Sequence, residues 1–437
     1  MTHSLVSCPV QSLKGTITVP GDKSISHRAV LFGAIAEGMT TITGCLNAED
    51  CMATKAAFRS MGVTIADASN DSLVIHGVGK YGLRAPKEPI QCGNSGTTMR
   101  LLAGLLAAQS FDSELIGDAS LQKRPMRRIS DPLTQMGADI ATTQGCPPLR
   151  IRGGHPLHGL SYDMPISSAQ VKSCIILAGL YAEGHTSVTE QLPTRDHTER
   201  MLKAFSYPVL LNGRTLTVNQ KHVCRGTTIR VPGDISSAAF FIVAATLIPH
   251  ADLWIRDVGI NATRTGIIDI LTHMGANIEI VNQRIWGEEL VADLHIQHAP
   301  LRGIEIPATC VPSAIDEFPA IFIAASCAIG TTILHGAEEL RHKESDRVAA
   351  MVDGLRTLGI SACTKESTVS IEGGILQGGV IDSRHDHRIA MAFAIAGAKA
   401  TSPVTIRQSE NIKTSFPNFV EAANSIQLHI QELDHGH

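Results

Sequence analysis

Aromatic side chains are scarce in this sequence, whose 437 residues include two Trp and four Tyr. Because 43% of the residues are nonetheless hydrophobic, we expect large cores built from Ala, Ile, Leu and Val, divided between at least two domains. No apolar run reaches the roughly 20 residues that a membrane-spanning helix requires, so no membrane partner is expected. The net charge is only −4 and both signs are interspersed, which argues against a nucleic-acid partner.

Cysteine pairs are lacking as well. The ten cysteines are scattered along the chain, and no two have the Cys-x-x-Cys spacing of zinc and redox motifs. The first fifteen residues lack the apolar segment of a signal peptide and the Arg-rich and Ser-rich composition of a transit peptide. We therefore expect reduced thiols in a cytoplasmic protein.

Six apolar segments, by contrast, each follow a polar or charged head. The heads read GDKSISHR, GNSGTTMR, SSAQVK, GDISS, SAIDE and RHDHR. Each apolar tail has the length of a buried helix. A helix that begins in this way offers free backbone N–H groups, the positive end of its dipole and cationic side chains, which together bind anions. The repetition predicts one pocket for several anionic groups.

A second element recurs between these helices: a strand, a polar loop and an amphipathic helix that ends near Met-Gly or Leu-Gly. The closing Gly, or the residue in its place, lies at positions 62, 137, 207, 275, 359 and 425, which gives six repeats of about 70 residues. Val19-Pro20-Gly21-Asp22 also returns as Val231-Pro232-Gly233-Asp234. We predict an α/β (α+β) fold of two similar domains with three repeats each and an interdomain cleft as the ligand site. The predicted domains are 21–232 and 1–20 plus 233–437, with crossovers near 20 and 232 and one N-terminal strand added to the second domain.

The first head places Lys23 and His27, and likewise Ser24 and Arg28, as i,i+4 neighbours. It is not a P-loop, because the first Gly of that motif is absent. In the second head, Gly96 would allow a ligand to approach the backbone closely, although Gly-Asn-Ser-Gly is also an ordinary loop. Capped helices with solvated charges are the alternative for both heads.

Two basic clusters lie outside the heads. In KRPMRR, a Pro125 at the first helical position would direct Arg124 along the helix axis, whereas a solvated basic turn is the alternative. In RHKESDR, Lys343 and Arg347 are expected to share one helix face with Glu344 beside them. A surface helix with ion pairs would show the same pattern and is the alternative.

Carboxylates and histidines also stand at helix starts. Asp316, which precedes Glu317, could act as a general base, or it could simply cap the helix. His385 and His387 form a His-x-His pair, but without further clustered ligands we expect no metal there. The cations at element starts suit a substrate pair with several phosphate or carboxylate charges. They are Lys23, Arg28, Arg100, Arg124, Lys343, Arg347 and Arg388.

The chain resembles the 5-enolpyruvylshikimate-3-phosphate synthase family in seven motifs: GDKSISHR, GNSGTTMR, QKRPMRR, SSAQVKS, HKESDR, DHRIAMAFA and SFP. The motifs follow one another in the same order as in that family and extend over nearly the whole chain. The resemblance implies the enolpyruvyl transferase fold, an inside-out α/β barrel with three βαβαββ repeats in each of two domains. It implies transfer of the carboxyvinyl group of phosphoenolpyruvate to the 5-hydroxyl of shikimate 3-phosphate through a tetrahedral adduct. The products are 5-enolpyruvylshikimate 3-phosphate, on the route to chorismate and aromatic amino acids, and phosphate. A monomer with small-molecule substrates and with no metal or organic cofactor is expected.

The resemblance also assigns residues. Those matched to shikimate 3-phosphate are Lys23, Ser24, Arg28, Ser168, Ala169, Gln170, Arg195, Asp316 and Lys343. Those matched to phosphoenolpyruvate are Lys23, Gly96, Arg124, Gln170, Arg347 and Arg388. Lys23, Asp316 and Glu344 are the implied catalytic residues, with Asp316 at the 5-hydroxyl and Glu344 at the vinyl methylene. Supporting roles are implied for Asn94, Arg100, His387 and Lys413.

Some positions depart from the family pattern. Ala169 stands where a second Ser is common, and Arg195 replaces a Tyr region, which would let it contact the substrate phosphate. Lys413 is displaced by one residue from the family Lys, where Thr414 now stands, so its role stays open. Gly96 is typical of members sensitive to glyphosate, although other features resemble the tolerant subgroup. We expect glyphosate to inhibit.

Two other functions are the alternatives. The sister transferase acting on UDP-N-acetylglucosamine places a Cys in the loop before its Arg-Pro, where this chain has Leu121-Gln122-Lys123. A non-catalytic anion-binding protein would have no use for Asp316 and Glu344 beside its ligand.

Overall fold

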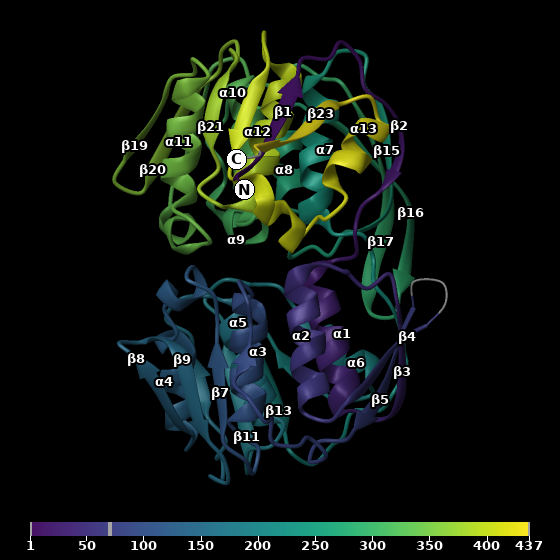
Figure 1. The fold of residues 1–437 in the computed structure, drawn as a ribbon, viewed down its shortest axis with the longest axis vertical. Coiled ribbons are helices and arrows are strands. Elements are labelled where there is room, and N and C mark those ends of the chain that lie inside the picture. The colour runs from purple at the N-terminus through teal and green to yellow at the C-terminus, as the bar shows by residue number, and fades with distance from the viewer. Residues whose placement is uncertain (1, 69–71, 436–437) are drawn as a thin grey trace. The chain divides into compact units, whose positions relative to one another are not determined.

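The computed structural model describes residues 2–68 and 72–435. The chain forms two compact units, drawn in Figure 1. Unit 1 contains Met1–Pro20, Pro232–Ile285 and Leu290–His437, and unit 2 contains Gly21–Val231 together with Trp286–Glu289. Each unit has its own large cluster of buried hydrophobic side chains.

Unit 2 forms, within its described residues, three four-stranded sheets with the strand orders β14-β3-β5-β4, β6-β7-β9-β8 and β10-β11-β13-β12. In each sheet the first pair is parallel and the other two pairs are antiparallel. The strands are β3 (Glu37–Thr43), β4 (Thr64–Ala68), β5 (Ser72–Val78), β6 (Ile90–Gln91), β7 (Ser113–Ile116), β8 (Asp139–Thr143), β9 (Cys146–Arg152), β10 (Ser161–Asp163), β11 (His185–Thr189), β12 (Leu210–Asn212), β13 (Thr215–Asn219) and β14 (Thr228–Arg230). The helices are α1 (Lys23–Ile35), α2 (Glu49–Ser60), α3 (Gly96–Leu106), η1 (Leu121–Lys123), α4 (Arg127–Gln135), α5 (Ala169–Gly179) and α6 (His197–Ala204).

Within its described residues, unit 1 has two four-stranded sheets, ordered β21-β22-β1-β23 and β16-β17-β15-β2, and one antiparallel three-stranded sheet, β18-β20-β19. Its strands are β1 (Thr2–Cys8), β2 (Lys14–Thr18), β15 (Asp252–Gly259), β16 (Asn277–Trp286), β17 (Glu289–Gln297), β18 (Thr331–Leu334), β19 (Ala362–Lys365), β20 (Thr368–Glu372), β21 (Gly379–Asp382), β22 (Val404–Arg407) and β23 (His429–His435). Its helices are α7 (Ile235–Leu247), α8 (Gly266–His273), η2 (Ala308–Cys310), α9 (Val311–Ala314), α10 (Phe318–Ser326), η3 (Glu338–His342), α11 (Arg347–Thr357), α12 (His387–Lys399), η4 (Ser409–Thr414) and α13 (Phe419–Ser425).

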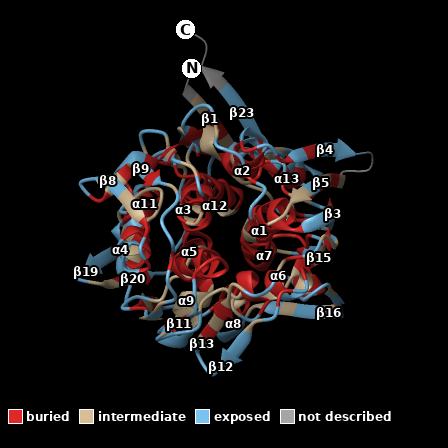
Figure 2. Cartoon of the chain, turned by 90° about the horizontal axis from the view of Figure 1, so that it is seen from below, coloured by how far each residue is buried: buried red, intermediate tan, exposed pale blue. Residues whose placement is uncertain are grey.

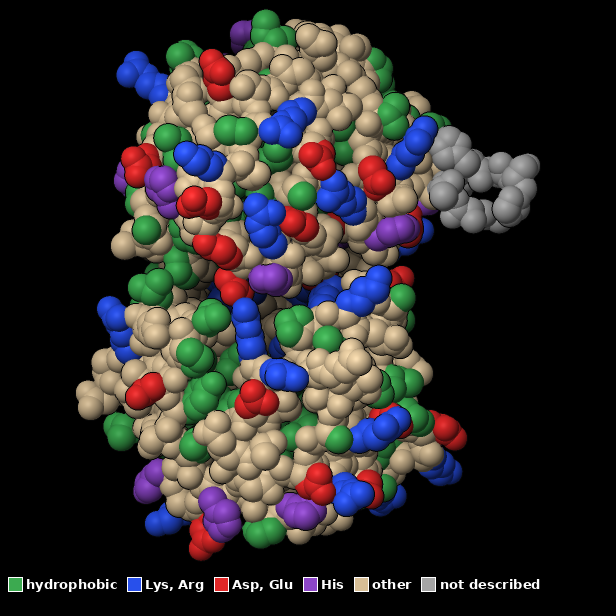
Figure 3. Space-filling model, turned by 90° about the vertical axis from the view of Figure 1, so that its left-hand side faces the viewer, with side chains coloured by type: hydrophobic (Ala, Val, Ile, Leu, Met, Phe, Trp, Pro, Cys, Tyr) green, Lys and Arg blue, Asp and Glu red, His purple; other side chains and the backbone are tan. Residues whose placement is uncertain are grey.

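The six apolar segments form the predicted buried helices: α1, α3 and α5 in unit 2, and α7, α10 and α12 in unit 1. Figure 2 shows α1, α3, α5, α7 and α12 coloured as buried along most of their length. Ala and Leu favour helix locally, and an apolar surface on all sides can only be accommodated inside a core. No helix among the described residues is long and apolar enough to cross a membrane. Over the face drawn in Figure 3, basic and acidic side chains are interspersed.

The amphipathic helices α2, α4, α8 and α11 end as predicted, at glycines with positive φ. These glycines are Gly62, Gly137, Gly275 and Gly359, with φ of 89°, 103°, 101° and 83°. In the two repeats without such a Gly, the left-handed residues are Ser206 (φ 59°) and Gln427 (φ 72°). The predicted positions 207 and 425 were therefore wrong, by one and two residues. Without Gly, the sequence carries no strong mark of the residue that adopts this conformation.

The N-terminal segment contributes two strands to unit 1 rather than the single strand predicted. β1 pairs antiparallel with both β22 and β23, and β2 pairs parallel with β15. The first twenty residues are thus shared between two sheets of this unit.

Candidate active site

The first anion-binding helix start is built around α1 in unit 2. The Asp22 carboxylate caps the helix by accepting from the backbone N–H of Ile25 at 2.9 Å. Lys23 follows, and its Nζ donates to Asp50 Oδ2 on α2 at 2.9 Å. Both partners of this ion pair are largely buried, so the ammonium group is held in one place at the positive end of a helix.

His27, one turn further along α1, does not add a positive charge. Its ring is buried, and Nδ1 lies 2.7 Å from Thr54 Oγ1 on α2. Burial, followed by the charges of Lys23 and Arg28, lowers the pKa of His27 well below its usual value. The imidazole is therefore neutral and belongs to the packing between α1 and α2.

Arg28 is the fixed cation of this region. It is 3% exposed, and its guanidinium donates from Nε to Thr198 Oγ1 and from Nη2 to Ser173 Oγ, each at 2.7 Å. Nη1 also donates to the carbonyl oxygen of Ser24 at 3.0 Å. Burial lowers the pKa of Arg28 to about 10, although Glu199 opposes the shift. The side chain therefore stays charged at neutral pH.

The second helix start, at α3, gathers two arginines around Gly96. A Cβ atom on this glycine would lie 2.9 Å from Arg100 Nη1 and 3.3 Å from Arg124 Nη1. Arg124 donates to Asn94 Oδ1 at 2.6 Å, and Arg100 donates to Gln170 Oε1 at 2.6 Å. The site residues predicted here do come together, because both guanidinium groups lie against the same backbone.

The Pro125 prediction was wrong. Helix α4 begins at Arg127, with Met126 as its cap residue, so Pro125 lies before the helix. Arg124 instead terminates the short helix η1 in an extended conformation. Its direction comes from the hydrogen bond to Asn94 and not from a helix axis.

The third helix start supplies polar groups. Ser168 stands at the cap position of α5 without a side-chain capping bond, and Ala169 and Gln170 form the first turn. Gln170 Nε2 donates to Thr97 Oγ1 at 3.0 Å, which ties α5 to α3. Arg195, just before α6, lies close enough to Arg28 that its charge lowers the pKa of Arg28.

In unit 1, the Asp316 carboxylate lies between two cations. Lys343 Nζ donates to Asp316 Oδ1 at 3.1 Å, and Arg347 Nη1 approaches the same oxygen at 3.5 Å. Asp316 is not a helix cap, because the cap residue of α10 is Glu317, which makes no side-chain capping bond. The predicted shared helix face was also wrong, since α11 begins only at Arg347 and Lys343 lies outside it. The two cations meet at a shared carboxylate instead.

Arg347 lies at the centre of a buried charge cluster. It is 1% exposed and donates from Nε to Asp386 Oδ2 at 2.8 Å and from Nη2 to Glu344 Oε2 at 2.5 Å. Burial alone would lower the pKa of Arg347, but Asp386, Glu344 and Asp316 raise it well above its usual value. For Asp386, burial would raise the pKa, yet the charge of Arg347 holds it below its usual value. Arg347 and Asp386 are therefore both ionised near neutral pH.

The remaining predicted residues of unit 1 follow Asp386. His387 and Arg388 form the first turn of α12 and are mostly buried, and Arg388 Nη1 lies 3.9 Å from Glu317 Oε1. Lys413 is exposed in η4. Within the described residues, its side chain forms no hydrogen bond or ion pair with the other predicted site residues. Among residues 2–68 and 72–435, no group of three or more His, Cys, Asp or Glu side chains could hold a metal ion.

Several supporting side chains escaped the sequence analysis. Asp50 pairs with Lys23, Ser173 and Thr198 hold Arg28, and Asp386 joins Arg347 to the start of α12. Asp386 and Ser173 lie within motifs that the sequence displays, DHRIAMAFA and SSAQVKS. Asp50 and Thr198 come from segments outside those motifs.

The family model described as EPSP synthase (3-phosphoshikimate 1-carboxyvinyltransferase) matches residues 8–423. The chain belongs to the EPSP synthase family. A protein of Legionella pneumophila (strain Lens) named 3-phosphoshikimate 1-carboxyvinyltransferase is 61% identical over 429 residues, which cover 98% of this chain and 99% of that protein. One of Methylococcus capsulatus with the same name is 58% identical over 424 residues, 97% of each chain.

A solved EPSP synthase of Acinetobacter baumannii has a TM-score of 0.89 to this structure at 53% sequence identity, and the match covers 99% of this chain and 100% of that one. The family and the fold class predicted from the motifs are thereby confirmed. Membership in the EPSP synthase family also decides against the two alternatives weighed from the sequence.

Proposed function

We propose that this chain transfers the carboxyvinyl group of phosphoenolpyruvate to the 5-hydroxyl of shikimate 3-phosphate. In the addition step, a bond forms between O5 and C2 of phosphoenolpyruvate, the hydroxyl proton goes to a base, and an acid protonates C3. In the elimination step, the C2–O bond to phosphate breaks and C3 gives up a proton, which restores the methylene group. The reaction therefore needs carboxylates for proton transfer and cations for the departing phosphate.

The observation that carries this proposal is the Asp316 carboxylate beside Lys343 and Arg347. Asp316 is the base for the 5-hydroxyl, and Lys343, whose Nζ lies 3.1 Å from this carboxylate, binds the same substrate. Glu344, bonded to Arg347 at 2.5 Å, exchanges the proton at C3. Lys23 contacts both substrates from the start of α1.

Binding roles are proposed for the remaining residues. Shikimate 3-phosphate is held by Ser24, Arg28, Ser168, Ala169, Gln170 and Arg195, and phosphoenolpyruvate by Gly96, Gln170, Arg124, Arg347 and Arg388. Asn94 and Arg100 support this site through their bonds to Arg124 and Gln170. His387 supports it from the start of α12. The proposed residues come from both units.

The buried cations support this division of roles. A phosphate dianion and a carboxylate bring several negative charges into one site, and fixed guanidinium groups offset the loss of their hydration. Ten cysteines without a disulfide among them support our proposal that the protein works in the reducing cytoplasm. We take the active form to be a monomer.

Phosphate release from shikimate 3-phosphate plus phosphoenolpyruvate tests the function. We expect release only when both substrates are present, and none when UDP-N-acetylglucosamine replaces shikimate 3-phosphate. Asp316→Asn should slow turnover by about 10²–10⁴-fold, as for loss of a general base, while the protein still folds. Asp353→Asn is the matched control, because Asp353 forms an exposed ion pair with Arg384 in the same unit. Wild-type protein that releases no phosphate would refute the proposal.

A further inference from the structure

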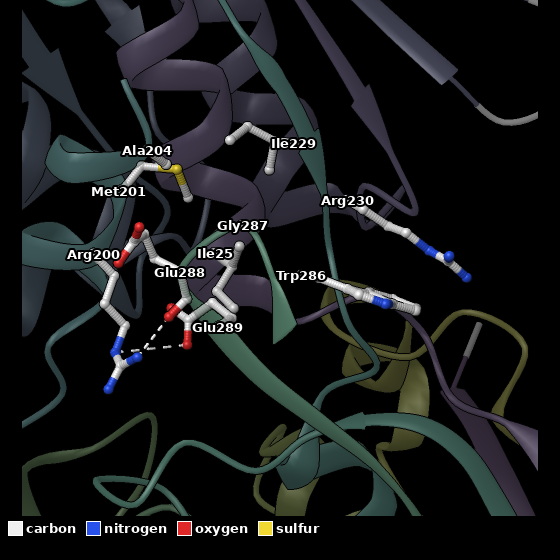
Figure 4. Close-up of a pocket in the computed structure, with 10 residues that line it drawn as sticks. All are labelled: Ile25, Arg200, Met201, Ala204, Ile229, Arg230, Trp286, Gly287, Glu288 and Glu289. Atoms are coloured by element: carbon white, nitrogen blue, oxygen red, sulfur yellow. Dashed lines mark hydrogen bonds and ion pairs between the residues drawn. The ribbon is translucent and has the colours of Figure 1, made fainter. Parts of the chain in front are cut away.

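The turn between β16 and β17 is part of unit 2, although most of both strands belongs to unit 1. Its residues, Trp286–Glu289, line a hollow of about 310 Å³ that opens to solvent (Figure 4). The other lining residues are Ile25, Arg200, Met201, Ala204, Ile229 and Arg230. Three of these lie on α6, so the turn is packed directly against that helix.

The turn is anchored at two places. Arg230 places its guanidinium carbon 3.4 Å from the centre of the Trp286 ring, a cation–π contact. Glu289, which is 6% exposed, accepts from His197 Nδ1 at 2.7 Å, and its other oxygen lies 3.9 Å from Arg200 Nε. Figure 4 shows Glu289 directed toward Arg200, while the Glu288 side chain points elsewhere. Arg200 Nη1 donates to the backbone oxygen of Glu288 at 2.5 Å.

The first turn of α6 has three consecutive buried residues, each with a different partner. His197 binds Glu289, Thr198 accepts from Arg28, and Glu199 pairs with Lys172 Nζ at 2.6 Å. A helix of eight residues has little intrinsic stability, so these contacts determine where it begins. A shift of His197 would move Thr198 with it, and Arg28 would lose an acceptor at 2.7 Å.

A buried carboxylate is costly, and a turn does not need one for its own geometry. The desolvation penalty of burying Glu289 is explained if the position of α6 matters to the substrate site. We propose that Glu289 is a positioning residue for shikimate 3-phosphate: it fixes the first turn of α6, and Thr198 in turn fixes the Arg28 guanidinium. This inference rests on the proposed function, in which Arg28 binds that substrate.

The test measures binding of shikimate 3-phosphate to the full chain by titration calorimetry, together with kcat and both KM values. Glu289→Ala should weaken binding about tenfold or more, the size expected for a lost bond to a charged group. Its kcat and its KM for phosphoenolpyruvate, at saturating shikimate 3-phosphate, should stay close to the wild-type values. The matched control is Glu288→Ala, which removes the neighbouring exposed carboxylate and should leave all constants within about twofold.

Variants at Thr198 test the proposed path. Thr198→Val should reproduce the loss of affinity, and Thr198→Ser, which keeps the hydroxyl, should restore it. The double variant with Glu289→Ala should bind no more weakly than Thr198→Val alone, because both changes act on Arg28. If Glu289→Ala does not fold, Thr198→Val and Glu289→Gln carry the same comparison.

Two outcomes would overturn the inference. One is that Glu289→Ala binds shikimate 3-phosphate as well as Glu288→Ala does. The other is a proportional loss of kcat and of both affinities, which would indicate a merely structural role. Failure of the wild-type protein to bind shikimate 3-phosphate would count against the proposed function instead.

Discussion

Replacing Asp386 by Asn should destabilise unit 1 far more than an ordinary change of charge does. The carboxylate is fully buried, bonds Arg347 through both oxygens at 2.8 and 3.3 Å, and caps α12 through the N–H of Arg388 at 2.9 Å. Asn caps helices about as well as Asp, so the substitution keeps the cap and the shape. It removes the charge and places an NH2 donor where Asp386 Oδ2 accepts from Arg347 Nε.

The expected magnitude follows from burial. Arg347 is 1% exposed and would keep only Glu344 and the more distant Asp316 as charged partners. Breaking a buried ion pair by removing one partner costs about 3–5 kcal/mol, and the two remaining carboxylates place the expected cost toward the lower end of this range. With a urea dependence near 3 kcal/mol per molar, the upper end of the usual range, the unfolding midpoint of unit 1 should fall by about 1–1.7 M.

The two tryptophans allow unit 1 to be followed alone. In a Trp286→Phe background, Trp254 on β15 is the only tryptophan left, and its fluorescence during urea unfolding reports on unit 1. Asp353→Asn serves as the control, because that carboxylate pairs with Arg384 at the surface and should cost at most about 1 kcal/mol. Equal midpoints for the two variants would show that the buried pair does not stabilise this unit.

Three further outcomes are expected. Because Arg347 lowers the pKa of Asp386 in the folded state, the stability it provides is complete above the unfolded pKa of about 4 and is lost as the pH falls below it. Acid titration of unfolding should therefore show a steeper loss for wild type than for Asp386→Asn. Gly96→Ala should raise the glyphosate inhibition constant about 5–150-fold more than it raises the KM for phosphoenolpyruvate, because the added methyl group would meet Arg100. Equal shifts in the two constants would contradict this. Lys23→Met should abolish most turnover while keeping the fold, and near-normal phosphate release would remove Lys23 from the mechanism.

The helices and the residues at their starts could be predicted because their signals are local. An apolar run with a polar head is legible in one stretch of sequence, and it led to α1, α3 and α12 directly. The same locality explains the errors. Spacing suggested a shared helix for Lys343 and Arg347, but α11 begins at Arg347 because Asp346 caps it by accepting from Ala349 N at 3.0 Å.

What the sequence could not provide is the set of distant partners. Arg28 and Thr198 are 170 positions apart, and His197 and Glu289 are 92 positions apart. Hydroxyl and carboxylate groups are common in any chain, so nothing marks these particular ones before the repeats have folded. The motif identifies the cation, whereas only the tertiary structure shows which acceptors hold it.

The central place of β1 in its sheet also bears on the order of events during translation. Ser4 pairs with Arg407 on one side and with Leu433 on the other. The first strand to leave the ribosome therefore cannot pair until β22 and β23, near the end of the chain, have been synthesised. Gly21–Val231 meets no such delay. Nascent chains stalled after Leu334 should therefore protect this segment from protease while their N-terminal strand is still digested, and full-length chains should protect both.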